Sequence, residues 1–358
     1  MINVTKTYLP KKENYFKYVD KIYENGWLTN NGPLLQEFES RLKDFLGVKN
    51  ILLVSNGTLA LQIAYKALEL KGEVLTTPFT FVATTSSIVW EGLTPKFIDI
   101  NPKTLNIDEE KIEEYISKDT CAIVPVHVFG NPANVRKIDS IAKKHNIKVI
   151  YDAAHAFDVK LNNQSILNFG DISTLSFHST KIFHSIEGGA LIINDDEIYK
   201  KAKRLINFGM IDKEKIAEVG INAKMNEFQA AMGLCVLDEY EQIVENRKKV
   251  YEYYKNKLKA DIEYPIIDKD ISWNYSYFPV IFRNEKITLN IINELNKLEI
   301  FPRRYFYPSL ETLNYVEKFN NIIHSTDISK RILCLPFYDS LSFDELDKII
   351  SIINNYKV

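Results

Sequence analysis

Cysteine is scarce in this sequence, and its spacing excludes several classes of protein. Cys121, Cys235 and Cys334 are the three cysteines among 358 residues, and they lie far apart. An odd and widely spaced set predicts neither a disulfide scaffold nor a zinc site, which needs closely spaced ligands. The spacing His-x-x-x-His is also missing, so we expect no metal. Buried thiols in a reducing cytoplasm are the expected outcome.

Excess charge and long apolar runs are also absent. A formal net charge of −2 provides no electrostatic attraction to nucleic acid or to an anionic membrane. No apolar run approaches the length that spans a bilayer, and the first residues lack the basic-then-apolar pattern of a secretion signal. We therefore expect a soluble, cytoplasmic protein with no nucleic-acid or membrane partner.

What the sequence does contain is a regular alternation of short apolar runs and helical segments. Strands are expected at 50–54, 73–76, 96–100, 121–126, 148–151, 172–175 and 190–193, and helices at 58–70, 83–90, 108–116, 135–145 and 195–207. Strands separated by helices of this size predict an α/β fold with a mostly parallel sheet. In such sheets ligands gather where the strands end at their carboxyl side.

The regions on either side of this alternation predict further elements. Pro33 follows an Asn-Gly turn and is expected to begin a helix. Beyond residue 207, one long charged helix is expected from Asn226 to Leu258. The later segments 276–282, 288–298 and 344–356 indicate a smaller α+β domain. With 46% hydrophobic residues in 358, the chain is expected to form two domains, 1–240 and 241–358.

Three of the predicted strands are followed by residues that suit a ligand. Gly57 and Thr58 open a helix whose amides could receive an anion, although Ser55 or Asn56 could equally be an ordinary cap. Phe81 could stack on a planar ligand or belong to the core. Asp152 stands among apolar residues, where a carboxylate is costly unless it is paired, caps a helix or meets a cationic atom.

Lys181 lies in the stretch Ser176-Phe177-His178-Ser179-Thr180-Lys181, between two apolar strands. A lysine in a surface turn is the simplest interpretation, but an enclosed lysine can lose its proton and act as a nucleophile. His178 is expected to pack beside it. An anion site, an aromatic, an isolated Asp and an enclosed Lys together match the needs of pyridoxal phosphate. The Gly-x-Gly-x-x-Gly of dehydrogenases and the Gly-x-Ser-x-Gly of hydrolases are missing.

At these residues the chain resembles the DegT/DnrJ/StrS family of pyridoxal-phosphate-dependent nucleotide-sugar aminotransferases. The resemblance spans nearly the whole chain. Its motifs are 27–33, 55–61, 77–83, 125–130, 151–156, 176–181, 187–189, 220–231 and 331–336. It implies a fold of the aspartate-aminotransferase type (fold type I) for the large domain. It also implies a homodimer whose active site is shared across the interface.

The resemblance also implies a role for each cofactor residue. Lys181 would join the aldehyde of pyridoxal phosphate and then move a proton, with pyridoxamine phosphate as the intermediate form of the cofactor. Asp152 would pair with the ring nitrogen, His155 would lie near the ring hydroxyl, and Phe81 would stack on the ring. The phosphate would be held by residues of both subunits, namely Gly57, Thr58 and Ser176 of one and Asn222 of the other.

The substrates follow from the same resemblance. Because relatives that dehydrate keto-sugars carry His in place of Lys181, amino transfer from glutamate to a nucleotide-linked, dTDP-4-keto-6-deoxy hexose is expected. The product would serve a surface polysaccharide such as lipopolysaccharide O-antigen. A 3-keto sugar, a sugar dehydratase and a non-catalytic sugar-nucleotide-binding regulator are the alternatives. The substrate-contacting residues are expected to be Thr29, Asn30, Glu187, Arg304 and Tyr305.

Overall fold

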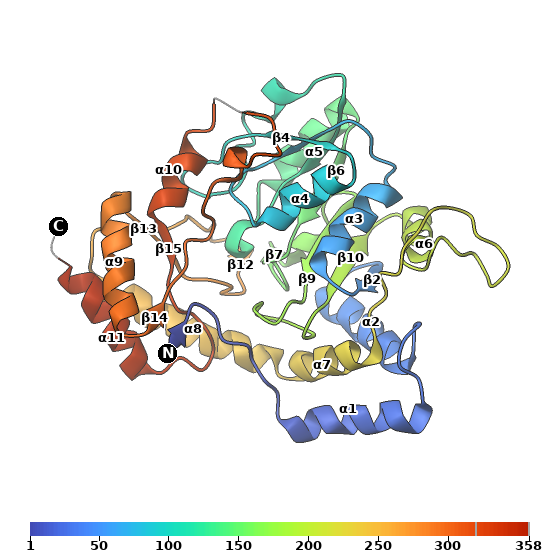
Figure 1. The fold of residues 1–358 in the computed structure, drawn as a ribbon, viewed down its shortest axis with the longest axis horizontal. Coiled ribbons are helices and arrows are strands. Elements are labelled where there is room, and N and C mark those ends of the chain that lie inside the picture. The colour runs from blue at the N-terminus through green and yellow to red at the C-terminus, as the bar shows by residue number, and fades with distance from the viewer. Residues whose placement is uncertain (319–320, 357–358) are drawn as a thin grey trace.

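The computed structural model describes residues 1–318 and 321–356 and is built around a seven-stranded sheet (Figure 1). The strands lie in the order β2-β10-β9-β6-β5-β3-β4. Their bounds are β2 (Ile51–Val54), β3 (Glu73–Thr76), β4 (Thr94–Phe97), β5 (Thr120–Val124), β6 (Lys148–Asp152), β9 (Ile172–Ser176) and β10 (Gly189–Ile193). Strand β10 is antiparallel to both of its neighbours, and the other adjacent pairs are parallel. The predicted mostly parallel α/β sheet is therefore confirmed.

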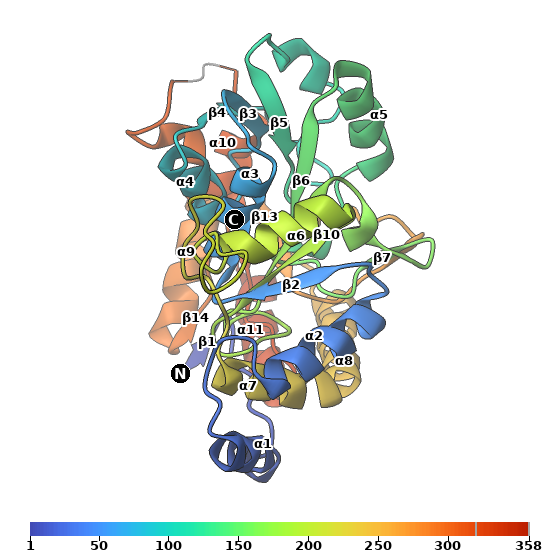
Figure 2. The same cartoon turned by 90° about the vertical axis from the view of Figure 1, so that its right-hand side faces the viewer.

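Helices cover both faces of this sheet because its strands are apolar on both sides. One face packs against α2 (Pro33–Leu46), α5 (Val135–His145) and α7 (Glu227–Asp238), and α1 (Lys12–Asn25) packs on the outer side of α7. The other packs against α3 (Gly57–Ala67), α4 (Val82–Trp90) and α6 (Asp196–Leu205). Pro33 is the first residue of α2, as its sequence context predicted. Figure 2 shows α6 on one side of the sheet and α2 with α7 on the other.

The C-terminal part of the chain has its own small core. Its sheet consists of β11 (Ile262–Glu263), β13 (Pro279–Phe282) and β15 (Ile332–Cys334). Its helices are α8 (Tyr240–Lys257), α9 (Glu285–Lys297), α10 (His324–Arg331) and α11 (Phe343–Asn355). Figure 1 shows α9, α10 and α11 with β13 and β15, coloured orange to red, beside the large sheet. The division into 1–240 and 241–358 stays a prediction, and α8 begins at its boundary.

Short elements complete the fold. β1 (Ile2–Asn3) pairs in parallel with β14 (Ile300–Phe301), so the chain begins against the C-terminal core. A third small sheet has the order β12-β7-β8, formed by β12 (Ile271–Ser272), β7 (Lys160–Leu161) and β8 (Gln164–Ser165). Single 3-10 turns occur at Ile112–Tyr115, Val128–Gly130, Ile166–Asn168 and Leu310–Thr312. Among the described residues, no helix is long and apolar enough to cross a membrane.

Two of the helix predictions were wrong. The long helix predicted from Asn226 to Leu258 breaks at Glu239 (φ −111°, ψ 4°), where the Glu239 carboxylate accepts hydrogen bonds from Tyr8 and Asn14 of the N-terminal segment. The helix at 108–116 is reduced to one 3-10 turn. Asp108 accepts a hydrogen bond from the backbone N–H of Glu110 (3.3 Å), a local bond that competes with helix formation.

Candidate active site

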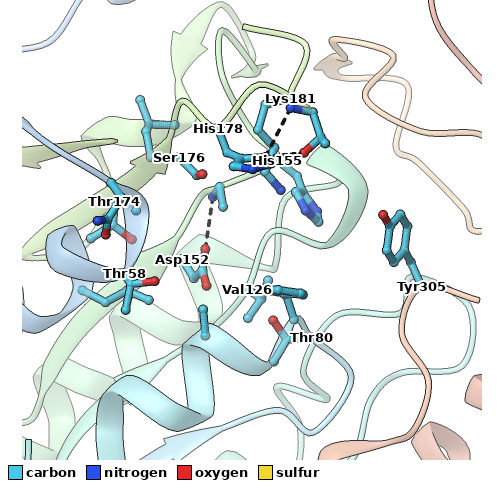
Figure 3. Close-up of a pocket in the computed structure, with 18 of the residues that line it drawn as sticks. Thr58, Thr80, Val126, Asp152, His155, Thr174, Ser176, His178, Lys181 and Tyr305 are labelled. Carbon is cyan, nitrogen blue, oxygen red and sulfur yellow. Dashed lines mark hydrogen bonds between the residues drawn. The ribbon is translucent and has the colours of Figure 1, made fainter. Parts of the chain in front are cut away.

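A cavity of about 310 Å³ opens where β2, β3, β6 and β9 end at their carboxyl sides. Nine of the predicted site residues line it: Gly57, Thr58, Phe81, Asp152, His155, Ser176, Lys181, Glu187 and Tyr305. Figure 3 shows Tyr305 facing the others from the C-terminal part of the chain. The strand-end rule therefore brings together residues that are far apart in the sequence.

Lys181 lies in the connection between β9 and β10, where its N–H donates to the carbonyl of His178 (2.9 Å). Its side chain is half-buried and reaches the cavity. Burial disfavours the ammonium form and lowers the pKa of Lys181 to about 8, against the opposing influence of the Asp152 charge. At neutral pH a part of the population therefore carries a neutral, nucleophilic amine.

Asp152 ends β6 as a buried carboxylate with two hydrogen bonds. Thr84 Oγ1 donates to Oδ2 (2.7 Å), and the backbone N–H of Ala154 donates to Oδ1 (3.1 Å). Burial raises the pKa of Asp152, while these two donors and Lys181 oppose that rise. Thr84 was missed by the sequence reasoning, although it lies one helical turn after Thr80, whose hydroxyl it also contacts (2.9 Å).

His155 is buried beside Asp152 and presents one ring nitrogen to the backbone. Its Nδ1 accepts a hydrogen bond from the N–H of Phe129 (3.2 Å). Burial, with a contribution from the charge of Lys181, lowers the pKa of His155 well below its ordinary value, so the ring is neutral. Since Nδ1 is an acceptor, the proton of the neutral ring resides on Nε2.

The N-terminus of α3 contributes free backbone amides. Asn56 caps the helix by accepting from the N–H of Leu59 (2.9 Å), so the ordinary capping interpretation is correct for that residue. The first-turn amides of Gly57 and Thr58 have no intrahelical partner. A Cβ on Gly57 would lie 2.9 Å from that of Ser176, because the helix begins directly against the end of β9. These donors, the amine and the carboxylate form a set that fits pyridoxal phosphate.

Phe81 and Glu187 lie at the rim. Phe81 is 58% exposed, which excludes it from the core of this chain. Glu187 Oε1 lies 3.4 Å from Nε2 of His178, and its backbone carbonyl accepts from Gln229 Nε2 (2.7 Å). His178, which was expected to pack, is instead partly exposed and lines the cavity. Ile186, just before Glu187, has φ +72°, a left-handed conformation that is rare for a β-branched residue.

Four of the predicted residues do not line this cavity. Thr29 and Asn30 lie in the exposed turn before α2, and Asn222 lies in the exposed segment before α7. Arg304 Nη1 is paired with Glu285 Oε1 (2.9 Å). The neighbouring Arg303, which the sequence reasoning did not select, lines the cavity instead.

Comparisons with known proteins agree with this geometry. The model of the DegT/DnrJ/EryC1/StrS aminotransferase family matches residues 10–354. The chain is similar to a dTDP-4-amino-4,6-dideoxy-D-glucose transaminase of Shigella dysenteriae, with 44% identity over 99% of each chain. It is also similar to a protein of the same description from Escherichia coli, with 38% identity over 98% of each chain.

Two solved structures are similar to this fold over nearly all of the chain. DesI, analysed in the presence of its TDP-sugar product, aligns with a TM-score of 0.93 at 28% identity, covering 99% of this chain and 92% of DesI. NtdA from Bacillus subtilis, with the cofactor PMP bound, aligns with a TM-score of 0.87 at 28% identity. That alignment covers 96% of this chain and 81% of NtdA.

Proposed function

This chain belongs to the DegT/DnrJ/EryC1/StrS aminotransferase family, and it is a pyridoxal-phosphate-dependent transaminase of sugar nucleotides. From this premise we propose that glutamate is the amino donor and that a dTDP-4-keto-6-deoxy hexose is the acceptor. The products are 2-oxoglutarate and a dTDP-4-amino-4,6-dideoxy hexose. The observation that carries the proposal is the convergence of the Lys181 amine and the buried Asp152 carboxylate on one cavity.

Lys181 is the proposed catalytic residue. Pyridoxal phosphate, when bound, supplies an aldehyde and an electron-withdrawing ring, which make a proton on the neighbouring substrate carbon acidic. Lys181 would hold the aldehyde covalently in the resting enzyme. When the substrate amine replaces it, the freed Lys181 amine, whose pKa is lowered by burial, would take that proton and return it to the adjacent cofactor carbon.

The remaining cofactor contacts are proposed from the positions of the lining residues. Asp152 would pair with the protonated ring nitrogen, since no cation forms an ion pair with its buried carboxylate within the described chain. Phe81 would cover the ring from the rim, and the Nε2–H of His155 would donate to the ring hydroxyl. The phosphate would lie at the start of α3, where the free amides of Gly57 and Thr58 and the hydroxyl of Ser176 are available.

The sugar nucleotide is proposed to approach from the rim formed by the C-terminal part of the chain. Tyr305, from that part of the chain, and Glu187, just before β10, line the cavity and suit hydroxyl groups of the sugar. Arg304, the residue expected from the sequence, is paired with Glu285, so Arg303, which lines the cavity, is the proposed contact for the diphosphate. The dTDP-linked, 4-amino character of the product is supported by the two similar transaminases, of Shigella dysenteriae and Escherichia coli.

We propose that the enzyme is a homodimer with shared active sites. The segment between α6 and α7, which extends from the body in Figure 1, exposes several apolar side chains that a monomer would leave in water. These are Phe208, Ile211, Ile216, Val219 and Ile221. Asn222 lies in the same segment, outside its own cavity, where it could reach the phosphate in a second copy. Thr29 and Asn30 are proposed to meet the partner's sugar nucleotide in the same way.

The dimer proposal is tested by placing a charge in this segment. Replacing Val219, which is 91% exposed, by Asp should shift the mass measured by light scattering from dimer to monomer and weaken cofactor binding. A monomeric wild-type protein that retains full activity would contradict the shared site.

The wider setting is proposed on chemical grounds. The product is an activated amino sugar, which suits the synthesis of a surface polysaccharide or glycan such as O-antigen. We propose a cytoplasmic location, in keeping with Cys121, Cys235 and Cys334, which are all free thiols.

The reaction itself is tested in two halves. Glutamate added to the cofactor-loaded enzyme should change the cofactor absorbance and release one equivalent of 2-oxoglutarate per site. dTDP-4-keto-6-deoxyglucose should then reverse the change and yield the amino sugar. Lys181→Ala should bind the cofactor without the covalent link and fail at both halves. A wild-type enzyme that yields no 2-oxoglutarate would refute transamination, and turnover only with a 3-keto sugar would refute the assigned acceptor.

A further inference from the structure

The segment Trp273–Ser276, in the C-terminal part of the chain, reaches the backbone of His155. Asn274 Nδ2 donates to the carbonyl of His155 (2.9 Å), and Ser276 Oγ donates to the same carbonyl (2.7 Å). Both side chains are buried, and Asn274 also donates to the carbonyl of Phe157 (2.8 Å). The main chain at His155 is therefore fixed by residues of a distant segment.

A second set of contacts reaches the ring of His155 through Phe129. Trp273 Nε1 donates to the carbonyl of Phe129 (2.9 Å), while the N–H of Phe129 donates to His155 Nδ1 (3.2 Å). Phe129 has φ +56° and ψ 23°, a left-handed conformation that is costly for a bulky residue. This conformation aims the N–H of Phe129 at His155 and its carbonyl at Trp273.

Close packing surrounds these bonds. A Cβ on Gly130 would lie 2.8 Å from both the Asn274 side chain and the His155 carbonyl, so only glycine fits there. The His155 ring lies nearly parallel to that of Phe306 (7° between planes, centroids 5.8 Å apart) and 4.8 Å from that of Tyr277. Both the orientation and the hydrogen bonding of the His155 ring are therefore determined.

The His155 ring therefore has one hydrogen-bond donor, and the position of that donor is defined. Nδ1 is occupied as an acceptor, so the single proton of the neutral ring lies on Nε2. Within the described chain, Nε2 has no hydrogen-bond partner, and His155 lines the cavity. A phenolic oxygen placed beside it would meet an N–H donor whose direction is already set, which reduces the entropic cost of binding.

We propose that Trp273, Asn274 and Ser276 are positioning residues that fix the tautomer and the ring orientation of His155. The Nε2–H of His155 is then a permanent donor to the hydroxyl oxygen on the cofactor ring. This inference rests on the proposed function, because it assumes that pyridoxal phosphate occupies the cavity. The alternative is that the three side chains only hold the C-terminal part of the chain against the large sheet.

The test is the tautomer of His155 in cofactor-free protein, read by 15N NMR of selectively labelled histidine. Wild-type protein should show Nε2–H only. Trp273→Phe keeps an aromatic ring at this position but removes the donor to the Phe129 carbonyl, so we expect a mixed tautomer and an unchanged fold by circular dichroism. Losing one ordinary hydrogen bond should weaken pyridoxal phosphate binding about fivefold.

Tyr251→Phe is the matched control. Tyr251 packs on Trp273 (centroids 5.2 Å apart) but, in the part of the chain that the structure describes, makes no hydrogen bond to Phe129, so its change should alter neither the tautomer nor the affinity. If Trp273→Phe does not fold, Ser276→Ala removes one of the two donors to the His155 carbonyl and is read in the same way.

Two outcomes overturn different conclusions. A folded Trp273→Phe protein that keeps the pure Nε2–H tautomer would refute the positioning role, whatever its cofactor affinity. A wild-type protein that shows this tautomer but does not bind pyridoxal phosphate would refute the proposed function and leave the positioning of His155 standing.

Discussion

Two neighbouring arginines have different surroundings, which gives a sharp test of the substrate site. Arg303 lines the cavity with its guanidinium 5.7 Å from the Tyr305 ring centroid, and within the described chain no carboxylate pairs with it. Arg304 is paired with Glu285 (2.9 Å) and lies over the Tyr307 ring at 3.5 Å. We predict that Arg303→Gln impairs sugar-nucleotide binding and that Arg304→Gln, with the same loss of charge, has little effect on it.

The two substitutions should change KM by different amounts, because they remove different interactions. A hydrogen bond from Arg303 to a charged group of the substrate is worth about 1.5–3 kcal/mol, which corresponds to an increase in KM of roughly 10- to 150-fold. The Arg304–Glu285 pair is partly exposed, and such pairs contribute about 0–1 kcal/mol to stability. Arg304→Gln should therefore appear as a small loss of stability, with KM changed less than about fivefold.

The assay also identifies which anion Arg303 meets. Steady-state kinetics give KM for glutamate and for the dTDP-keto-sugar separately, and the glutamate half-reaction can be followed alone by cofactor absorbance. If Arg303 contacts the diphosphate, only the KM of the sugar nucleotide rises. If it contacts a glutamate carboxylate, the first half-reaction weakens as well. Equal effects of the two substitutions, or a larger one for Arg304→Gln, would refute the reasoning.

Three further predictions follow from the cofactor site. Thr84→Val removes the hydroxyl donor to Asp152, which should lower the free energy of unfolding by about 1.5–3 kcal/mol at neutral pH, as measured by denaturant titration. The loss should be smaller at an acidic pH where Asp152 is protonated, and an equal loss at neutral and acidic pH would contradict this. Acylation of Lys181 in cofactor-free protein, followed by mass spectrometry, should rise through a pH of about 8, since only the neutral amine reacts; labelling in step with the surface lysines would contradict its burial. Gly57→Ala places a Cβ 2.9 Å from that of Ser176, so phosphate affinity should fall in a binding titration, and unchanged affinity would argue against an anion site there.

The elements that position the site could be predicted from sequence because they depend on local patterns. Apolar runs and helix signals located the strands of the large sheet, and the strand-end rule then selected Asp152 and Lys181. What could not be predicted depends on contacts between distant segments. The helix break at Glu239 is tied to Tyr8, and the ring orientation of His155 depends on Trp273. The hydrophobic periodicity of a sequence does not reveal contacts between such distant residues.

The turn before α2 shows why part of the site lies outside the cavity of its own chain. Asn30 and Asn31 have φ values of +62° and +60°, and the turn is exposed. It is nevertheless firmly held, because the buried Glu227 carboxylate accepts from the N–H groups of Leu34 (2.8 Å) and Leu35 (2.9 Å). A mobile surface loop would not need a buried carboxylate to fix its end. An exposed turn that its own chain holds rigid suits a surface preorganised for another molecule, and this supports the proposal that the turn meets the cavity of a second copy.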